Sequence, residues 1–163
     1  MAQYTGKIWV LGDDIDTDII IPTEYLALKT IDDMKQYGFS PLRPELAGQI
    51  KPGDIIVAGK NFGCGSSREQ APEVIKALGI PCIIAKSFAR IFYRNALNNG
   101  LLLLEQPELH DVVKEGDTIT VTVNEDVDYN GKKYPIASLP ENLMEIIEAG
   151  GLVKAMRKRN GLD

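Results

Sequence analysis

Residues 59–69 read Gly59-Lys60-Asn61-Phe62-Gly63-Cys64-Gly65-Ser66-Ser67-Arg68-Glu69, a glycine-rich stretch between two apolar segments. The segment before it, 54–58, is short and apolar and predicts a buried strand. After it, apolar residues recur at the spacing of a helix, at Ala71, Val74, Ile75 and Leu78. The stretch is therefore predicted to be a strand-to-helix junction, which is typical of α/β proteins.

The residue types in this junction are typical of a site that binds an anion. Gly63 and Gly65 allow positive φ angles and let a ligand come close to backbone amides. Ser66 and Ser67 supply hydroxyl groups, and Arg68 in a first helical turn would oppose the helix dipole unless an anion lay beside it. A guanidinium also binds a carboxylate through two parallel hydrogen bonds. We therefore expect the junction to hold an anionic ligand.

Two other interpretations of the junction stay open. Residues 66–69 fit the capping box S-x-x-E, whose only task is to start a helix. The pattern Gly63-x-Gly65-x-x-Arg68 resembles a dinucleotide fingerprint without its third glycine, but the next strand, 81–85, ends in Lys86 where an acidic ribose partner is expected. A stand-alone module that binds an anion or a nucleotide is thus the alternative from another functional class.

Composition limits the partners that this chain could have. Its 163 residues predict a single domain, 1–163, and the net charge of −5 argues against nucleic-acid binding. Cys64, Cys82 and the lone His110, predicted to be a surface residue, fit no metal-ligand spacing, so no metal site is expected. The N-terminus has no signal-peptide pattern and no apolar run approaches the ~18 residues of a membrane span, so a cytoplasmic protein without membrane contact is predicted.

The remaining elements alternate between strands and helices. Strands are predicted at 6–11, 19–21, 101–104 and 118–123, and helices at 31–37, 90–99 and 140–150. A strand-helix-strand middle between strand-rich ends predicts an α/β fold with mixed rather than purely parallel pairing.

Two further clusters contain polar residues that could join the site. In 86–90, Ser87 is the predicted N-cap of a second helix and Arg90 is again a first-turn cation, so the two helix starts could converge on one anion. The pattern Asp14-x-Asp16-x-Asp18 begins like a calcium loop, but its sixth position is isoleucine and its twelfth is tyrosine. This acidic loop is either a solvated turn or a polar part of the site.

Three motifs, at 12–18, 59–69 and 86–96, together resemble the small-subunit family of 3-isopropylmalate dehydratase, which is similar to the swivelling fourth domain of aconitase. The resemblance extends over nearly the whole chain. It implies a three-layer β/β/α swivelling fold with a mixed sheet or barrel, and docking onto a separate large subunit that carries a [4Fe-4S] cluster. This chain holds no cluster itself, because three thiolates are needed and it has two cysteines.

The resemblance also implies a reaction and roles for individual residues. The heteromeric hydro-lyase would convert 2-isopropylmalate into 3-isopropylmalate through isopropylmaleate, a step of leucine biosynthesis. Ser66 would be the base, Ser67 and Arg68 would bind a carboxylate of this small di-acid substrate, and Asp18 would support the active site.

Substrate choice is predicted to depend on residues 25–29. Homoaconitase-like relatives carry an arginine in this loop to meet an extra carboxylate, whereas Ala27 and Leu28 suit an isopropyl group. Leu28 could equally be a packed core residue, and Lys29 could still meet an acidic substituent. The small subunit of a homoaconitase, or of a citramalate or dimethylmalate hydro-lyase, is therefore the alternative within the same class.

Overall fold

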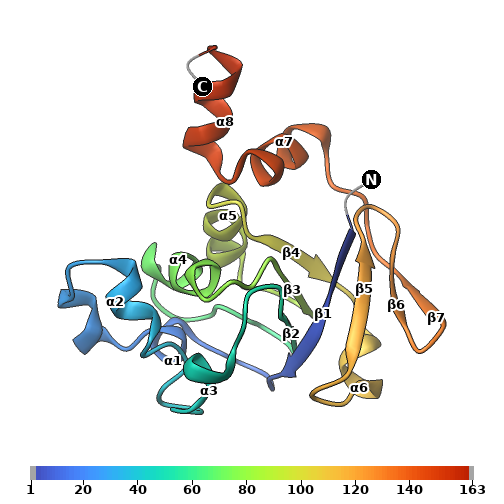
Figure 1. Cartoon of the computed structure of the whole chain (residues 1–163), viewed down its shortest axis with the longest axis horizontal. Helices are drawn as coiled ribbons and strands as arrows, with labels where there is room; N and C mark the ends of the chain where they lie inside the picture. The colour runs from blue at the N-terminus through green and yellow to red at the C-terminus, as the bar shows by residue number, and fades with distance from the viewer. Residues whose placement is uncertain (1–2, 162–163) are drawn as a thin grey trace.

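The computed structural model describes residues 3–161, which contain a mixed sheet of seven strands in the order β4-β3-β2-β1-β5-β6-β7 (Figure 1). The strands are β1 (Gln3–Val10), β2 (Ile55–Ala58), β3 (Cys82–Ala85), β4 (Leu102–Glu105), β5 (Thr118–Thr122), β6 (Asp126–Tyr129) and β7 (Lys132–Pro135). The predicted α/β fold with mixed pairing is confirmed.

The sheet has a parallel half and an antiparallel half that share β1. The second part of β1 pairs in parallel with β2, and β2, β3 and β4 continue the parallel order. These three strands are almost entirely buried, as expected for continuous apolar runs covered on both faces. The first part of β1 pairs with β5 in antiparallel order, and buried and more exposed residues alternate along β5 and β6. Such alternation is typical of strands with one buried face.

The sheet forms a half-barrel with a hydrophobic core on each face. One core lies inside the half-barrel, and the other lies between the sheet and the helices. Ile56 and Ala58 of β2 pack with the helices, whereas Ile55 and Val57 pack with residues of β5 and β6. Helices, parallel strands and antiparallel strands therefore form three layers, which confirms the predicted β/β/α arrangement.

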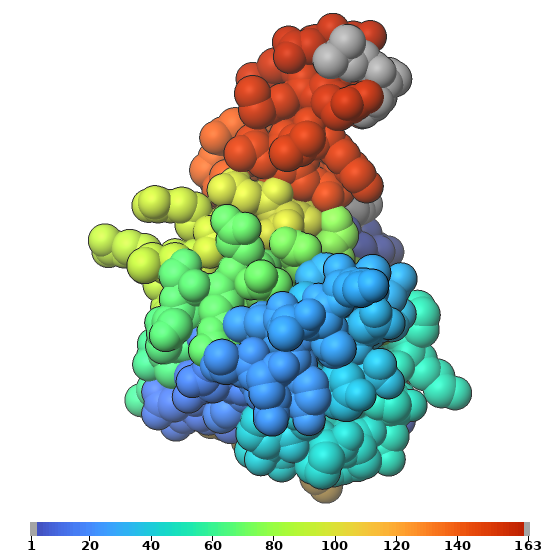
Figure 2. All heavy atoms as spheres, turned by 90° about the vertical axis from the view of Figure 1, so that its left-hand side faces the viewer, coloured from blue at the N-terminus to red at the C-terminus, as the bar shows by residue number. Residues whose placement is uncertain are grey.

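The helices are mostly short and gather on the parallel half. They are α1 (Thr17–Ile20), the 3-10 helix η1 (Thr23–Ala27), α2 (Ile31–Lys35), α3 (Leu46–Gln49), α4 (Gln70–Ala77), α5 (Arg90–Asn98), α6 (Leu109–Val112), α7 (Glu141–Ala149) and α8 (Leu152–Arg159). Helix α7 packs against α5 and buries Ile147 in the core, whereas α8 has no buried residue and belongs to the red segment that projects at the top of Figure 2. None of the helices within residues 3–161 is both long and apolar enough to cross a membrane.

The predicted strand at 19–21 is wrong, because Ile19 and Ile20 form the end of helix α1. The side chain of Asp16 accepts a hydrogen bond from the Ile19 amide at 2.8 Å and caps the helix. A run of three apolar residues carries too little periodicity to decide between strand and helix, so the capping carboxylate decides.

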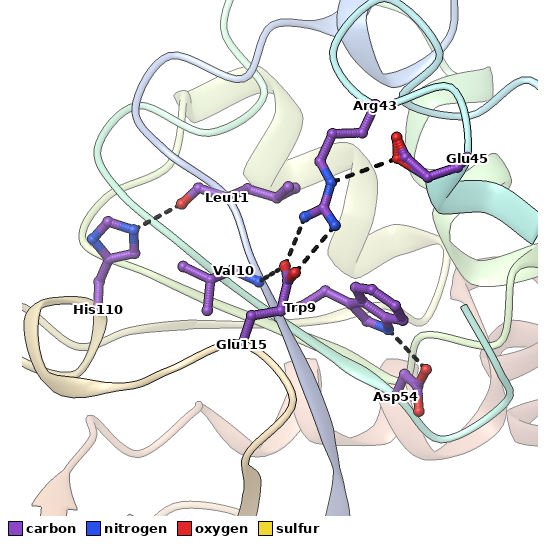
Figure 3. Close-up of polar contacts among 8 residues, drawn as sticks. All are labelled: Trp9, Val10, Leu11, Arg43, Glu45, Asp54, His110 and Glu115. Atoms are coloured by element: carbon purple, nitrogen blue, oxygen red, sulfur yellow. Dashed lines mark hydrogen bonds and ion pairs between the residues drawn. The ribbon is translucent and has the colours of Figure 1, made fainter. Parts of the chain in front are cut away.

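A group of polar contacts joins distant segments beside β1 (Figure 3). The guanidinium of Arg43 donates to both carboxylate oxygens of Glu115, at 2.6 and 3.1 Å, and Glu115 also accepts from the Val10 amide at 3.0 Å. The Trp9 indole donates to the buried Asp54 carboxylate at 2.8 Å.

His110 is half-buried rather than a surface residue, and its Nε2 lies 2.7 Å from the Leu11 carbonyl oxygen (Figure 3). Since a carbonyl only accepts, Nε2 carries the proton. This bond ties α6 to the end of β1, which explains why the side chain is drawn inward.

Candidate functional site

The glycine-rich segment 59–69 leaves β2 at Ala58 and forms a loop before α4 begins at Gln70. The capping-box interpretation is wrong, because Glu69 occupies the N-cap position and no side chain caps the helix. Arg68 also lies before the first turn of α4 rather than in it. The predicted conflict between the Arg68 charge and the dipole of α4 is therefore absent, and the charge must be balanced by other groups.

The loop is held against the acidic loop 13–18 by direct hydrogen bonds. The Gly63 amide donates to the Ile15 carbonyl at 2.7 Å, and the Thr17 amide donates to the Cys64 carbonyl at 2.9 Å. The buried Thr17 hydroxyl donates to the Ser66 carbonyl at 2.7 Å. These bonds fix the backbone of Ser66, although its own side chain is at the surface.

The carboxylates of the acidic loop make separate contacts instead of forming one cluster. Asp13 accepts from the Lys60 amide at 2.7 Å, Asp14 accepts from the Asn61 side chain at 3.0 Å, and Asp16 caps α1. Within residues 3–161 no group of three or more His, Cys, Asp or Glu could hold a metal ion. The acidic loop therefore supports the glycine-rich loop through these hydrogen bonds.

Arg68 is the most constrained charge at this junction. Its side chain is 14% exposed, and it forms an ion pair with Asp18, whose side chain is 64% exposed. The two terminal nitrogens of the guanidinium also donate to the Ile21 carbonyl at 3.0 Å and to the Thr23 hydroxyl at 2.8 Å. The sequence predicted both Asp18 and Arg68 as site residues, and the structure brings them into contact.

A cavity of about 220 Å³ lies between this loop and the start of α5. The two strand-to-helix junctions thus meet at one cavity, as their sequences suggested. The loop contributes three predicted residues to its lining, Ser66, Ser67 and Arg68. The remaining lining residues are Thr17, Gly63, Gly65, Ala89, Arg90, Ile91, Phe92 and Asn95.

Ser87 is not the N-cap of α5, which begins after Ala89 without a side-chain cap. The Ser87 hydroxyl instead accepts a hydrogen bond from the Asn61 amide at 2.8 Å. It therefore connects the two junctions that border the cavity.

Thr17, Ile91 and Asn95 line the cavity but were not singled out from the sequence. Ile91 and Asn95 are one helical turn apart on α5, so their shared face could have been predicted once Arg90 was placed at the helix start. No local pattern marks Thr17, because its role depends on a contact with the distant Ser66.

Ala27 and Leu28, the predicted substrate contacts, are not among the residues that line this cavity. Ala27 ends the 3-10 helix η1 and is exposed, whereas Leu28 is half-buried against the core that contacts the helices.

Both cysteine thiols have a pKa above the ordinary value. Partial burial, followed by the nearby charges of Asp16 and Asp14, raises the pKa of Cys64. Complete burial in β3 raises the pKa of Cys82 to about 12. At neutral pH neither thiol is poised to act as a nucleophile or a metal ligand.

A larger hollow, of about 560 Å³, lies between the ends of α4 and α5 and the start of α8. The Lys76 ammonium at its edge already donates to the Asn99 carbonyl at 2.8 Å and the Gly150 carbonyl at 2.7 Å. The smaller cavity is the stronger candidate site, since it combines two serine hydroxyls with two guanidinium groups.

Comparisons with known sequences agree on one family. Residues 21–109 match the family of aconitase C-terminal domains. A 3-isopropylmalate dehydratase small subunit from Lachnospira eligens is 79% identical over 161 residues, which cover 99% of this chain and 98% of the relative. An isopropylmalate/citramalate isomerase small subunit from Methanocaldococcus jannaschii is 46% identical over 157 residues and covers 94% of each chain.

The fold agrees with a solved relative. A crystal structure of 3-isopropylmalate dehydratase from Methanocaldococcus jannaschii superposes with a TM-score of 0.92 at 40% sequence identity. The match covers 99% of this chain and 97% of that chain.

Proposed function

The chain belongs to the family of 3-isopropylmalate dehydratase small subunits, and on this premise we propose that the cavity beside Ser66 is its half of a hydro-lyase active site. Together with a large subunit, the chain would convert 2-isopropylmalate into 3-isopropylmalate through isopropylmaleate. The observation that carries this proposal is the convergence of Ser66, Ser67 and Arg68 on one cavity. Family membership also favours this function over that of a stand-alone nucleotide-binding module.

Ser66 is the proposed base. It takes a proton from the carbon next to a carboxylate, and the hydroxyl group on the neighbouring carbon leaves; water then adds back with the opposite regiochemistry. A serine alkoxide is a costly base unless nearby positive charge and exclusion of water stabilise it. Arg68 lines the same cavity, and the docked large subunit would exclude water from its mouth.

Ser67 and Arg68 are the proposed carboxylate ligands. In the chain alone, Asp18 already presents a carboxylate to Arg68. We propose that a substrate carboxylate binds Arg68 in the place of the Asp18 carboxylate, whose side chain is 64% exposed. Asp18 then supports the site by holding Arg68 in place when no substrate is bound.

The residues of this chain do not fit a [4Fe-4S] cluster. Cys82 is buried in β3, Cys64 lies in the loop, and the described residues hold no metal-binding group. We therefore assign the cluster to the large subunit, where its iron would polarise the leaving hydroxyl. Every step proposed for this chain concerns proton transfer and carboxylate binding.

Ala27 and Leu28 are the proposed contacts for the isopropyl group, although they lie outside the cavity of this chain alone. They would border the substrate only once the large subunit completes the site. The relative named for both isopropylmalate and citramalate makes citramalate a second candidate substrate.

Anaerobic reconstitution with the large subunit tests this proposal. Ser66→Ala should lower kcat by about 10²- to 10⁴-fold, the usual range for a general base, and leave the folding of the chain unchanged. Ser138→Ala is the matched control, because Ser138 is exposed after β7 and, among residues 3–161, its hydroxyl bonds only to the Asn124 carbonyl. Turnover at the wild-type rate by Ser66→Ala would remove Ser66 from the mechanism.

The same assay also tests substrate choice through isopropylmalate, citramalate and homocitrate. Preference for isopropylmalate or citramalate over homocitrate supports the apolar contact at Ala27 and Leu28. Preference for homocitrate contradicts it.

A further inference from the structure

Two guanidinium groups line the cavity, and they differ in how fully their charge is satisfied. Arg68 is largely buried, pairs with Asp18 and donates to two further oxygens. Arg90 is exposed, and no side chain or backbone group within residues 3–161 forms a hydrogen bond or an ion pair with it. The unsatisfied cation of the cavity is therefore Arg90.

The position of Arg90 is unfavourable for the stability of the chain alone. It is the first residue of α5, where a cation opposes the positive end of the helix dipole. The first turn of α5 has no acidic residue that would offset this charge. A negative group bound in the cavity would relieve the repulsion.

Asn95 lies one turn further along α5 and also lines the cavity. Its side-chain amide can donate two hydrogen bonds. No hydrogen bond of this amide to another residue is formed within the described part of the chain. The α5 wall of the cavity thus adds a charge and an amide without a partner among the described residues to the wall formed by Ser66, Ser67 and Arg68.

We infer that Arg90 binds the second carboxylate of the substrate, with Asn95 as an additional donor. This inference rests on the proposed function, because that substrate carries two carboxylates on neighbouring carbons. Arg68 and Ser67 hold one carboxylate on the loop wall, and Arg90 holds the other on the α5 wall. The carbon that loses its proton is thereby kept between the two walls, next to Ser66.

The test compares two arginines of α5 in the reconstituted heteromer. Arg90→Gln should raise KM for 2-isopropylmalate about 10- to 100-fold, the loss expected for one charged hydrogen-bonding contact, and change kcat much less. Arg90→Lys should fall between wild type and Arg90→Gln, since it keeps the charge but loses the planar fork. Arg94→Gln is the control, because Arg94 is an exposed arginine of the same helix that does not line the cavity.

Titration with the large subunit separates substrate binding from docking. Our inference requires that Arg90→Gln assemble with the affinity of wild type. It is overturned if KM stays unchanged, or if the variant assembles more weakly and KM recovers once the large subunit is saturating. Either result would leave the proposed function intact as long as Ser66→Ala remains inactive, so failure of the two hypotheses can be told apart.

Discussion

Gly63 borders the cavity at a position that has no room for a side chain. The variant Gly63→Ala measures the stability lost when a Cβ atom is added there. Its φ of +84° lies in the left-handed region, which is about 1–2 kcal/mol unfavourable for an L-residue. A Cβ atom at this position would lie 2.5 Å from Cβ of Phe92 and nearer still to its ring. Phe92 is buried on α5 and cannot give way freely, so overpacking adds about 1–3 kcal/mol.

The two terms predict that Gly63→Ala lowers the free energy of unfolding by about 2–5 kcal/mol. For a chain of this size that corresponds to a fall in Tm of roughly 4–20 °C. Urea unfolding followed by circular dichroism measures the change. Gly48→Ala is the control, because Gly48 lies in α3 with ordinary φ and a Cβ there would meet nothing within 4 Å. Gly48→Ala should raise the free energy of unfolding by about 0.5–1 kcal/mol.

A double-mutant cycle separates strain from collision. Against a Phe92→Ala background the collision with the ring is gone and only the close approach of the two Cβ atoms remains, so adding Gly63→Ala should lower stability by clearly less than it does in wild type. The reasoning is refuted if the free energy of unfolding of Gly63→Ala is within about 0.5 kcal/mol of that of wild type. It is also refuted if the cycle shows no coupling energy between positions 63 and 92.

Two further predictions concern the ionisable groups Glu115 and Cys64. The hydrogen bonds from Arg43 hold the pKa of Glu115 below the ordinary 4.5, so the stability it contributes is present above pH 4.5 and is lost as pH falls through the lower folded-state pKa. Because the Glu115 side chain is 37% exposed, Glu115→Gln should lower stability by only about 1 kcal/mol at pH 7 and by progressively less as the pH falls below 4.5; a loss in urea unfolding that stays constant as the pH is lowered would contradict this. Partial burial and the charges of Asp16 and Asp14 raise the pKa of Cys64. At pH 7 iodoacetamide should therefore label Cys64 more slowly than free cysteine, and the labelling rate of Cys64 should increase as the pH is raised. Labelling at pH 7 as fast as that of free cysteine would show the thiol to be activated, and Cys82 should stay unlabelled until the chain unfolds.

The strand-helix-strand middle was predictable because its signals are local. The apolar runs 54–58, 81–85 and 101–104 became β2, β3 and β4, since strands buried on both faces need no alternation. The hairpin of β6 and β7 was missed, although Asn130-Gly131 marks it with positive φ at both residues, 52° and 84°. An Asn-Gly pair between short strands is a strong hairpin signal, so this miss was avoidable.

The candidate site was partly predictable for the same reason. Ser66, Ser67 and Arg68 are neighbours in sequence, so their residue types alone point to an anion. The sequence could not show that Arg68 already pairs with Asp18, nor that Arg90 has no partner among residues 3–161.

The sequence by itself therefore determined the strands and helices of the middle of the chain, where the candidate anion-binding groups lie along it, and that too few thiols are present for a cluster. Only the tertiary structure decided that loops from β1, β2 and β3 meet at one cavity, and which of its two cations lacks a partner in the described part of the chain. The physical reason is that propensity and periodicity act over a few residues. The balance of charge in a site depends on groups that the folded chain brings together from distant positions.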